Sequence, residues 1–158
     1  MRVLFVCTGN ICRSPTAEGV FRRLVEEAGL AHAIEVDSAG TGDWHAGQPP
    51  DARSQEASAR RGIDLSAQRA RPVRRDDFHA FDVILAMDRG HLRQLRRAAP
   101  PGAPARIELL LDHAPEHGRD VPDPYYGAGD GFERVLDMIE AAGGRLLAAL
   151  REDIAARD

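Results

Sequence analysis

The residues whose types and spacing are best suited to catalysis lie near the start of the chain, between Cys7 and Ser14. Cys7 is followed six positions later by Arg13, and a guanidinium group can hold two phosphoryl oxygens through a pair of hydrogen bonds. The thiolate of a cysteine is a strong nucleophile, and converging N–H donors with a nearby guanidinium favour that form. We therefore expect Cys7 to attack phosphorus while Arg13 binds the phosphoryl group.

The segment between these two residues has the composition of a phosphate-binding loop. Gly9 permits backbone angles that other residues avoid, and Asn10 tolerates the left-handed conformation and can brace the loop through its amide. Backbone N–H groups that converge ahead of a helix N-terminus can surround a dianionic phosphoryl group. Ser14 is placed to donate a hydrogen bond to the thiolate. The predicted loop comprises Cys7, Thr8, Gly9, Asn10, Ile11, Cys12, Arg13 and Ser14.

A second segment supplies a candidate proton donor. Asp123 stands between Pro122 and Pro124, whose rings restrict the backbone on both sides. The leaving oxygen of a phosphate ester needs a proton, and a carboxyl group beside a bound dianion holds its proton more readily. We expect Asp123 to protonate the leaving group and then to activate the water that hydrolyses a phosphocysteine.

Each of these residues also has a purely structural interpretation when it is taken alone. Cys7 would then be a small buried side chain, Arg13 would pair with a surface acid, and Asp123 would only shape a turn. The order strand, loop and helix around Cys7 favours the catalytic interpretation, because ligands of open α/β sheets bind at the carboxyl ends of the strands.

The hydrophobic pattern indicates the elements that must position these residues. Residues 2–6 form an apolar run typical of a buried strand. Ser14 is a good N-cap and Pro15 a good first residue for the helix that follows. Further strands are predicted at 34–36, 82–87 and 106–111, further helices at 51–61, 88–98 and from about 132 onward, and irregular segments at 38–50 and 112–131. Apolar strands that alternate with helices indicate an α/β fold with a parallel sheet covered on both faces.

The bulk composition excludes several classes of protein. We expect residues 1–158 to form a single domain, and a net charge of −4 argues against nucleic-acid binding. No apolar run approaches the ~20 residues of a membrane helix and no signal peptide precedes the first strand, so we expect a cytoplasmic protein without membrane insertion. The chain has only two cysteines, which gives neither a disulfide framework nor a zinc site. We expect no metal and no other cofactor.

Two motifs together resemble the low-molecular-weight protein tyrosine phosphatases. They are VCTGNICRSPTAE at 6–18 and DPYYG at 123–127, and the similarity extends over almost the whole chain, including 37–41, 87–88 and the final helix. The resemblance implies a four-stranded parallel sheet with helices on both faces and the phosphate-binding loop between the first strand and the first helix. It also implies a phosphocysteine intermediate formed on Cys7.

The resemblance assigns roles to individual residues as well. It makes Arg13 the phosphate ligand and Asp123 the general acid, with Ser14 assisting the thiolate. Asn10 and Ser38 would hold the shape of the loop. The family commonly has a histidine after its second helix that bonds to the loop asparagine. Gln68 takes that place here, so we expect altered loop rigidity with activity retained.

Three aromatic residues bear on the substrate. Trp44 is the only tryptophan, and Tyr125 and Tyr126 adjoin Asp123. In the family-like arrangement Trp44 and Tyr125 wall a deep slot that holds a phenyl ring and excludes phosphoserine, whereas Tyr126 can equally pack a loop. Relatives that act on phosphoarginine resemble a version with a small polar residue where Ile11 stands. Ile11 and the tyrosine pair therefore favour phosphotyrosine.

Other functions stay open on the sequence alone. A protein-arginine phosphatase would use the same loop, and so would an arsenate reductase, although that chemistry needs further cysteines and the chain has none after Cys12. A non-catalytic phosphate-binding or redox-sensing module is a third alternative. Cys12 can form a reversible disulfide that protects Cys7 from further oxidation, or it can be a small buried side chain.

The expected partners follow from the favoured function. They are phosphotyrosine-containing proteins and, through them, a tyrosine kinase. We expect the chain itself to be a monomer or a weak dimer.

Overall fold

A four-stranded parallel sheet forms the centre of the molecule. The computed structural model describes residues 1–114, 120–126 and 130–157. The strands are β1 (Arg2–Cys7), β2 (Glu35–Gly40), β3 (Val83–Ala86) and β4 (Arg106–Leu109), in the order β2-β1-β3-β4. Each neighbouring pair is parallel. The predicted parallel sheet is confirmed, and β1 is one of its two inner strands.

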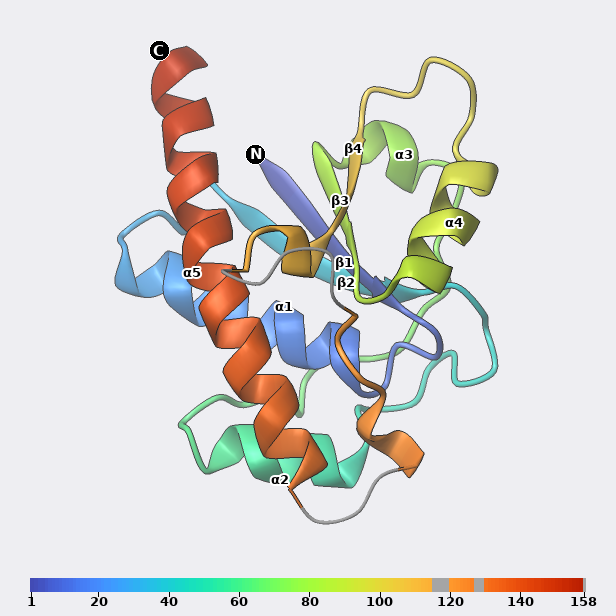
Figure 1. The fold of residues 1–158 in the computed structure, drawn as a ribbon, viewed down its shortest axis with the longest axis vertical. Helices are drawn as coiled ribbons and strands as arrows, with labels where there is room; N and C mark the ends of the chain where they lie inside the picture. Colours follow the sequence, from blue (N-terminus) through green and yellow to red (C-terminus); the bar gives the residue numbers. More distant parts are fainter. Residues whose placement is uncertain (115–119, 127–129, 158) are drawn as a thin grey trace.

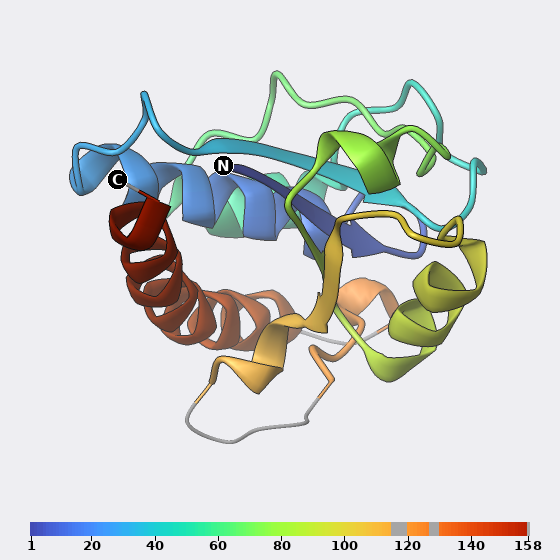
Figure 2. The ribbon, with the colours of Figure 1, turned by 90° about the horizontal axis from the view of Figure 1, so that it is seen from above.

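Helices cover both faces of this sheet. They are α1 (Arg13–Glu27), α2 (Ala52–Ala59), α3 (Asp77–Ala80), α4 (Arg89–Ala98) and α5 (Gly131–Arg157), with 3₁₀ turns η1 (Leu110–Asp112) and η2 (Pro124–Tyr126). Figures 1 and 2 show α1 and α5 together on one face and α3 and α4 on the other. Within the described ranges, no helix is both long enough and apolar enough to cross a membrane.

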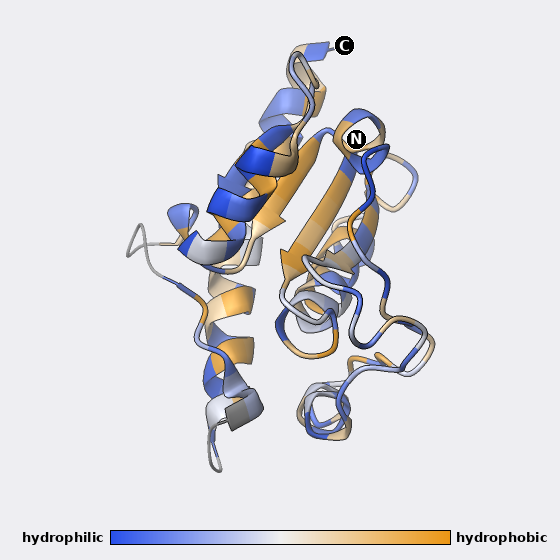
Figure 3. Cartoon of the chain, turned by 90° about the vertical axis from the view of Figure 1, so that its right-hand side faces the viewer, coloured by the Kyte–Doolittle hydropathy of each residue, from blue (hydrophilic) through white to orange (hydrophobic). Residues whose placement is uncertain are grey.

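The side chains of β1 divide the hydrophobic core into two layers. Val3 and Phe5 pack with residues of α1 and α5, whereas Leu4 and Val6 point the other way and pack with residues of α3 and α4. Successive side chains of a strand alternate between faces, so an apolar residue is needed at every position of a strand buried on both sides. Figure 3 shows the apolar strands enclosed between the helical layers. The core therefore fixes the carboxyl end of β1, where Cys7 stands.

Several boundaries differ from those predicted. β2 continues to Gly40 rather than ending near residue 36, because its backbone pairs with β1 as far as Cys7. This extension places Ser38 inside a strand. The short helix α3 was not predicted, since four residues carry no clear hydrophobic period. β4 ends at Leu109 rather than residue 111, because η1 begins at Leu110. Part of the irregular segment 112–131 lies outside the described residues, and its described part contains the last residue of η1 and all of η2.

Candidate active site

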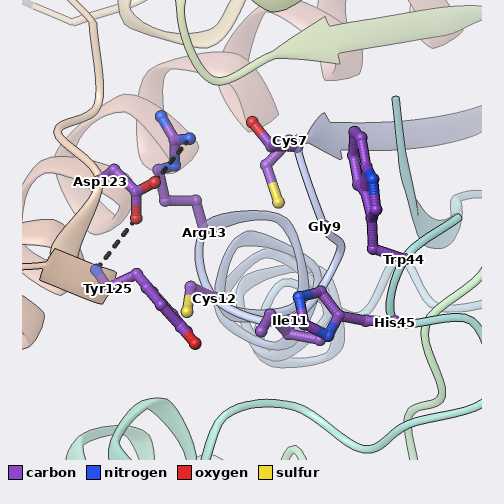
Figure 4. Close-up of a pocket in the computed structure, with 10 residues that line it drawn as sticks. Cys7, Gly9, Ile11, Cys12, Arg13, Trp44, His45, Asp123 and Tyr125 are labelled. Atoms are coloured by element: carbon purple, nitrogen blue, oxygen red, sulfur yellow. Dashed lines mark hydrogen bonds and ion pairs between the residues drawn. The ribbon is translucent and has the colours of Figure 1, made fainter. Parts of the chain in front are cut away.

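A pocket of about 420 Å³ opens at the carboxyl end of β1. Figure 4 shows the sulfur of Cys7 between Asp123 and Tyr125 on one side and Trp44 and His45 on the other. The lining residues are Cys7, Thr8, Gly9, Ile11, Cys12, Arg13, Trp44, His45, Asp123 and Tyr125. Segments far apart in the sequence thus meet around one thiol.

Ser14 lies behind the pocket and contacts the thiol directly. Its Oγ is 3.0 Å from the Sγ of Cys7, and both residues are buried. The Ser14 hydroxyl can donate to this sulfur or to the carbonyl oxygen of Ala39, 3.4 Å away. The prediction that Ser14 caps α1 is wrong, because Cys12 holds the N-cap position and makes no side-chain capping bond. The serine hydroxyl is used for the thiol instead.

Asn10 braces the loop from inside. Its φ of 58° is positive, the only such value at a non-glycine residue in the described part of the chain. Its Nδ2 donates to the Oγ atoms of Ser14 at 2.8 Å and Ser38 at 3.0 Å. Its Oδ1 accepts the backbone N–H of Arg71 at 3.0 Å. One amide therefore fixes the loop to α1, to β2 and to the segment before α3.

Gly9 serves a different purpose from the one predicted. Its φ is not in the left-handed region, which Asn10 occupies instead. A Cβ at Gly9 would lie 2.8 Å from the His45 ring, so the missing side chain makes room for that ring. His45 was given no role by the sequence, because nothing local to residue 45 indicates contact with residue 9.

The hydrogen bonds that support Asn10 continue through Ser38 of β2 to a buried acid, Glu18. Ser38 Oγ donates to Glu18 Oε1 at 2.7 Å, and Arg22 pairs with Oε2 at 2.7 Å. Burial raises the pKa of Glu18, against the opposing effect of the bonds from Ser38 and Arg22. The predicted supporting position of Ser38 is thereby tied to α1 through Glu18.

Gln68 does not make the contact to Asn10 that its place in the family pattern implies. Its Nε2 donates to the carbonyl oxygen of Pro15 at 3.0 Å. The Asn10 amide already bonds to Ser14, Ser38 and the backbone of Arg71. Gln68 thus supports the first turn of α1, while the backbone N–H of Arg71 supports Asn10.

Arg13 is buried and held on the floor of the pocket by groups outside the loop. Its Nη1 donates to Asp88 Oδ2 at 2.9 Å and to the carbonyl oxygen of Val121 at 3.0 Å. Its Nη2 lies 3.6 Å from Asp123 Oδ2. Partial burial would raise the pKa of Asp88, but the His91 backbone N–H and the charge of Arg13 outweigh it and lower that pKa. Asp88 therefore stays ionised and orients the guanidinium.

Asp88 was not among the predicted site residues, although the sequence carried a signal for it. Asp88 lies two residues after the end of β3 and is the N-cap of α4. In a parallel sheet, the carboxyl end of β3 lies beside that of β1. An acid at this position is therefore brought to the edge of the sheet where Cys7 stands.

On the same side of the loop, Thr8 makes a contact that the sequence did not indicate. Its Oγ1 lies 2.7 Å from the Nε2 of His91, in the first turn of α4. His91 is 4% exposed, and burial lowers its pKa to about 4. The ring is therefore uncharged at neutral pH.

Asp123 and the aromatic residues form the rim of the pocket. Asp123 Oδ1 accepts the backbone N–H of Tyr125 at 3.0 Å. Trp44 and Tyr125 are 68% and 40% exposed, the two large apolar side chains with high exposure in the described ranges. Arg53 lies over the Tyr125 ring at 5.4 Å from its centroid. Tyr126 belongs to η2, and its side chain lies outside the described residues.

Cys12 is buried and, like Cys7, free. Burial, together with the charge of Asp51, raises the pKa of Cys12 to about 12, so this thiol keeps its proton. The protective disulfide between the two cysteines stays a prediction. Among the described residues, no group of three or more His, Cys, Asp and Glu side chains could hold a metal ion.

The fold and this pocket together define a class of protein. A free thiol and a buried arginine on a strand-to-helix loop, with a carboxyl group at the rim, are residues of the kinds that a cysteine-dependent phosphatase uses. The family model described as low molecular weight phosphotyrosine protein phosphatase matches residues 2–156. The chain belongs to this family.

Individual relatives agree with this assignment. A low molecular weight protein-tyrosine-phosphatase of Streptomyces coelicolor is 51% identical over 160 residues, covering 99% of this chain and 97% of the relative. The crystal structure of a protein tyrosine phosphatase from Entamoeba histolytica has a TM-score of 0.92 at 39% identity and covers 97% of this chain and 98% of its own. A Drosophila arginine phosphatase has a TM-score of 0.87 at 34% identity, with 95% and 98% covered.

Proposed function

We propose that this chain hydrolyses phosphotyrosine on proteins through a phosphocysteine intermediate on Cys7. The observation that carries the proposal is the position of the Cys7 thiol, 3.0 Å from the Ser14 hydroxyl and in one pocket with Arg13 and Asp123. In this proposal the substrates are phosphotyrosine-containing proteins, products of a tyrosine kinase. The reaction takes place in the cytoplasm and requires no metal.

The first step transfers the phosphoryl group to sulfur. The loop N–H groups and Arg13 hold the three outer phosphoryl oxygens. Nη1 of Arg13 is fixed by Asp88 and Val121, while Nη2 exchanges its 3.6 Å contact with Asp123 for the phosphoryl group, which it binds together with Nε. The thiolate of Cys7 forms the S–P bond as the P–O bond to the tyrosine breaks. Asp123 gives its proton to the departing phenolate oxygen.

The second step releases phosphate. Asp123, now a carboxylate, takes a proton from a water molecule whose oxygen forms a bond to phosphorus. The S–P bond breaks and its electron pair returns to Cys7, where the Ser14 hydroxyl stabilises the thiolate. Inorganic phosphate leaves, and Asp123 is again protonated for the next cycle.

The rim of the pocket supports phosphotyrosine as the substrate. Trp44 and Tyr125 stand on opposite sides of the thiol (Figure 4), and the apolar side chain of Ile11 lines the pocket between them. A phenyl ring can stack against such walls. The stem of phosphoserine is too short to bring its phosphate to the thiol while the peptide backbone stays outside the pocket. The similar arginine phosphatase of Drosophila makes phosphoarginine the second candidate.

Hydrolysis of three peptides in EDTA tests the proposal. We would compare phosphotyrosine, phosphoserine and phosphoarginine peptides with wild type, Cys7→Ser and Asp123→Asn. We expect phosphotyrosine turnover that Cys7→Ser abolishes and that Asp123→Asn slows by about 10²- to 10⁴-fold. Asp76→Asn is the matched control, because Asp76 is exposed and makes no capping bond. Preference for phosphoarginine would overturn the substrate, and undiminished turnover by Cys7→Ser would overturn the mechanism.

A further inference from the structure

The catalytic loop is held from two sides, and only one of them involves groups that the sequence indicated. On the side of β2, Asn10 Nδ2 bonds to Ser38 at 3.0 Å. On the side of β3, Thr8 Oγ1 contacts His91 Nε2 at 2.7 Å. The two contacts are made by loop residues on either side of Gly9, two positions apart. The contact to His91 joins residues 83 positions apart in the sequence.

His91 faces the same acid that orients Arg13. Its backbone N donates to Asp88 Oδ1 at 2.8 Å, and its Nδ1 lies 3.2 Å from that oxygen. Asp88 Oδ2 accepts from Arg13 Nη1 at 2.9 Å. A continuous chain of contacts therefore leads from Thr8 through His91 and Asp88 to Arg13.

The carboxylate determines which ring nitrogen carries the proton. A negative oxygen 3.2 Å from Nδ1 favours the proton on Nδ1, although the pair does not have the geometry of a full hydrogen bond. Nε2 is then an acceptor, and the Thr8 hydroxyl donates to it. The charged groups around the ring are Asp88, Arg13, Asp123 and Asp120.

We propose that His91 is a positioning residue that fixes Thr8, and with it the first N–H groups of the phosphate-binding loop, relative to Asp88 and Arg13. This inference rests on the proposed function of the Cys7 loop. Without the bond to His91, the Thr8 hydroxyl would have to find another partner, and the backbone at residues 8 and 9 would lose its anchor on α4. The loop N–H groups and the guanidinium would then no longer be held in one arrangement before the phosphate binds.

Substitutions that keep the size of the His91 or Thr8 side chain but remove its hydrogen bond can test this role. His91→Phe fills the same space but cannot accept a hydrogen bond, and Thr8→Val removes the hydroxyl at nearly constant volume. We expect each to lower kcat/KM for phosphotyrosine by about five- to tenfold and to raise the inhibition constant of inorganic phosphate by a similar factor. His91→Gln, whose amide oxygen can reach the position of Nε2, should recover most of both losses.

The double variant separates positioning from a general loss of structure. If His91 acts through Thr8, then His91→Phe combined with Thr8→Val should be no worse than either single variant. The control His79→Phe, at an exposed histidine, should leave both constants unchanged. Additive losses, failure of His91→Gln to recover activity, or unchanged phosphate inhibition in His91→Phe would overturn the role of His91. Failure of the wild type to hydrolyse phosphotyrosine would instead overturn the proposed function. The same assay distinguishes the two outcomes, because it measures the wild type and the variants separately.

Discussion

The hydroxyl of Ser14 links Cys7, the proposed nucleophile, to Asn10, which braces the loop. It lies 3.0 Å from the Cys7 sulfur and accepts from Asn10 Nδ2 at 2.8 Å. Because the Asn10 amide donates to this oxygen, the Ser14 proton is available for the Cys7 sulfur, which is closer than the competing carbonyl oxygen of Ala39 at 3.4 Å. In the proposed mechanism, this arrangement matters most when the S–P bond breaks and negative charge returns to sulfur.

Ser14→Ala should therefore slow catalysis without destroying the pocket. A hydrogen bond to a charged group contributes about 1.5–3 kcal/mol, so we expect kcat to fall by about 10- to 100-fold. Steady-state kinetics with a phosphotyrosine peptide measures the loss, and Ser66→Ala at an exposed position is the matched control. A kcat equal to that of the wild type would show that the contact has no role in turnover.

The residues of the site differ in how far the sequence could predict them. Cys7 and Arg13 were predictable because they share one short loop whose residue types all suit phosphate binding. Asp88 and His91 were not predicted, because their contacts with the loop span 75 and 83 positions, and an acid after a strand indicates this site only once the order of the strands is known. Such contacts depend on β3 lying beside β1, and hydrophobic periodicity gives no strand order.

At the scale of elements, the close approach of β2 to the catalytic loop restricts Gly40. A Cβ at Gly40 would lie 2.8 Å from the Thr8 carbonyl oxygen and 3.2 Å from the carbonyl carbon of Gly9. Both are backbone atoms of the loop and cannot rotate away. Strand β2 was predicted too short, because its last residues are small and polar and its length is set by pairing with β1.

Gly40→Ala should move the loop and reduce both stability and activity. We expect the free energy of unfolding to fall by about 1–3 kcal/mol and kcat/KM by about 10- to 100-fold. Urea unfolding and phosphotyrosine hydrolysis measure the two effects. Wild-type values of both would contradict the close packing of β2 against the loop.

Two adjacent glycines in α5 should respond differently to alanine. A Cβ at Gly144 would meet no neighbouring atom within 4 Å, whereas a Cβ at Gly143 would lie 3.1 Å from Leu24 Cδ1 of α1. Alanine restricts the unfolded chain, so Gly144→Ala should raise the free energy of unfolding by about 0.5–1 kcal/mol. Gly143→Ala should gain less or lose stability. Urea midpoints distinguish the two, and a destabilised Gly144→Ala would contradict the packing of α5.

At the scale of the whole molecule, buried His91 makes stability depend on pH. Burial lowers its pKa from 6.5 to about 4. Between these values the unfolded chain binds a proton at His91 and the folded protein does not. The stabilising contribution is therefore complete above pH 6.5 and is lost as the pH falls toward 4, by about 3 kcal/mol in total.

Comparison of wild type with His91→Gln isolates this contribution. Other groups, including Glu18 with its raised pKa, titrate in both proteins and cancel in the difference. We expect the wild type to lose its free energy of unfolding more steeply than His91→Gln as the pH falls from 6.5 to 4. Urea unfolding at several pH values measures the difference, and parallel curves would show that His91 is not held uncharged by the fold.

The most direct test of the account is to find the phosphoryl group on Cys7 during turnover. Asp123→Asn mixed with 4-nitrophenyl phosphate should accumulate the intermediate, because this leaving group needs little protonation while water attack still lacks its base. After a denaturing quench and proteolysis, mass spectrometry should locate one phosphoryl group on the peptide that contains Cys7, at its sulfur. A phosphoryl group on another residue, or turnover that persists in Cys7→Ser, would contradict the assignment of Cys7 as the nucleophile.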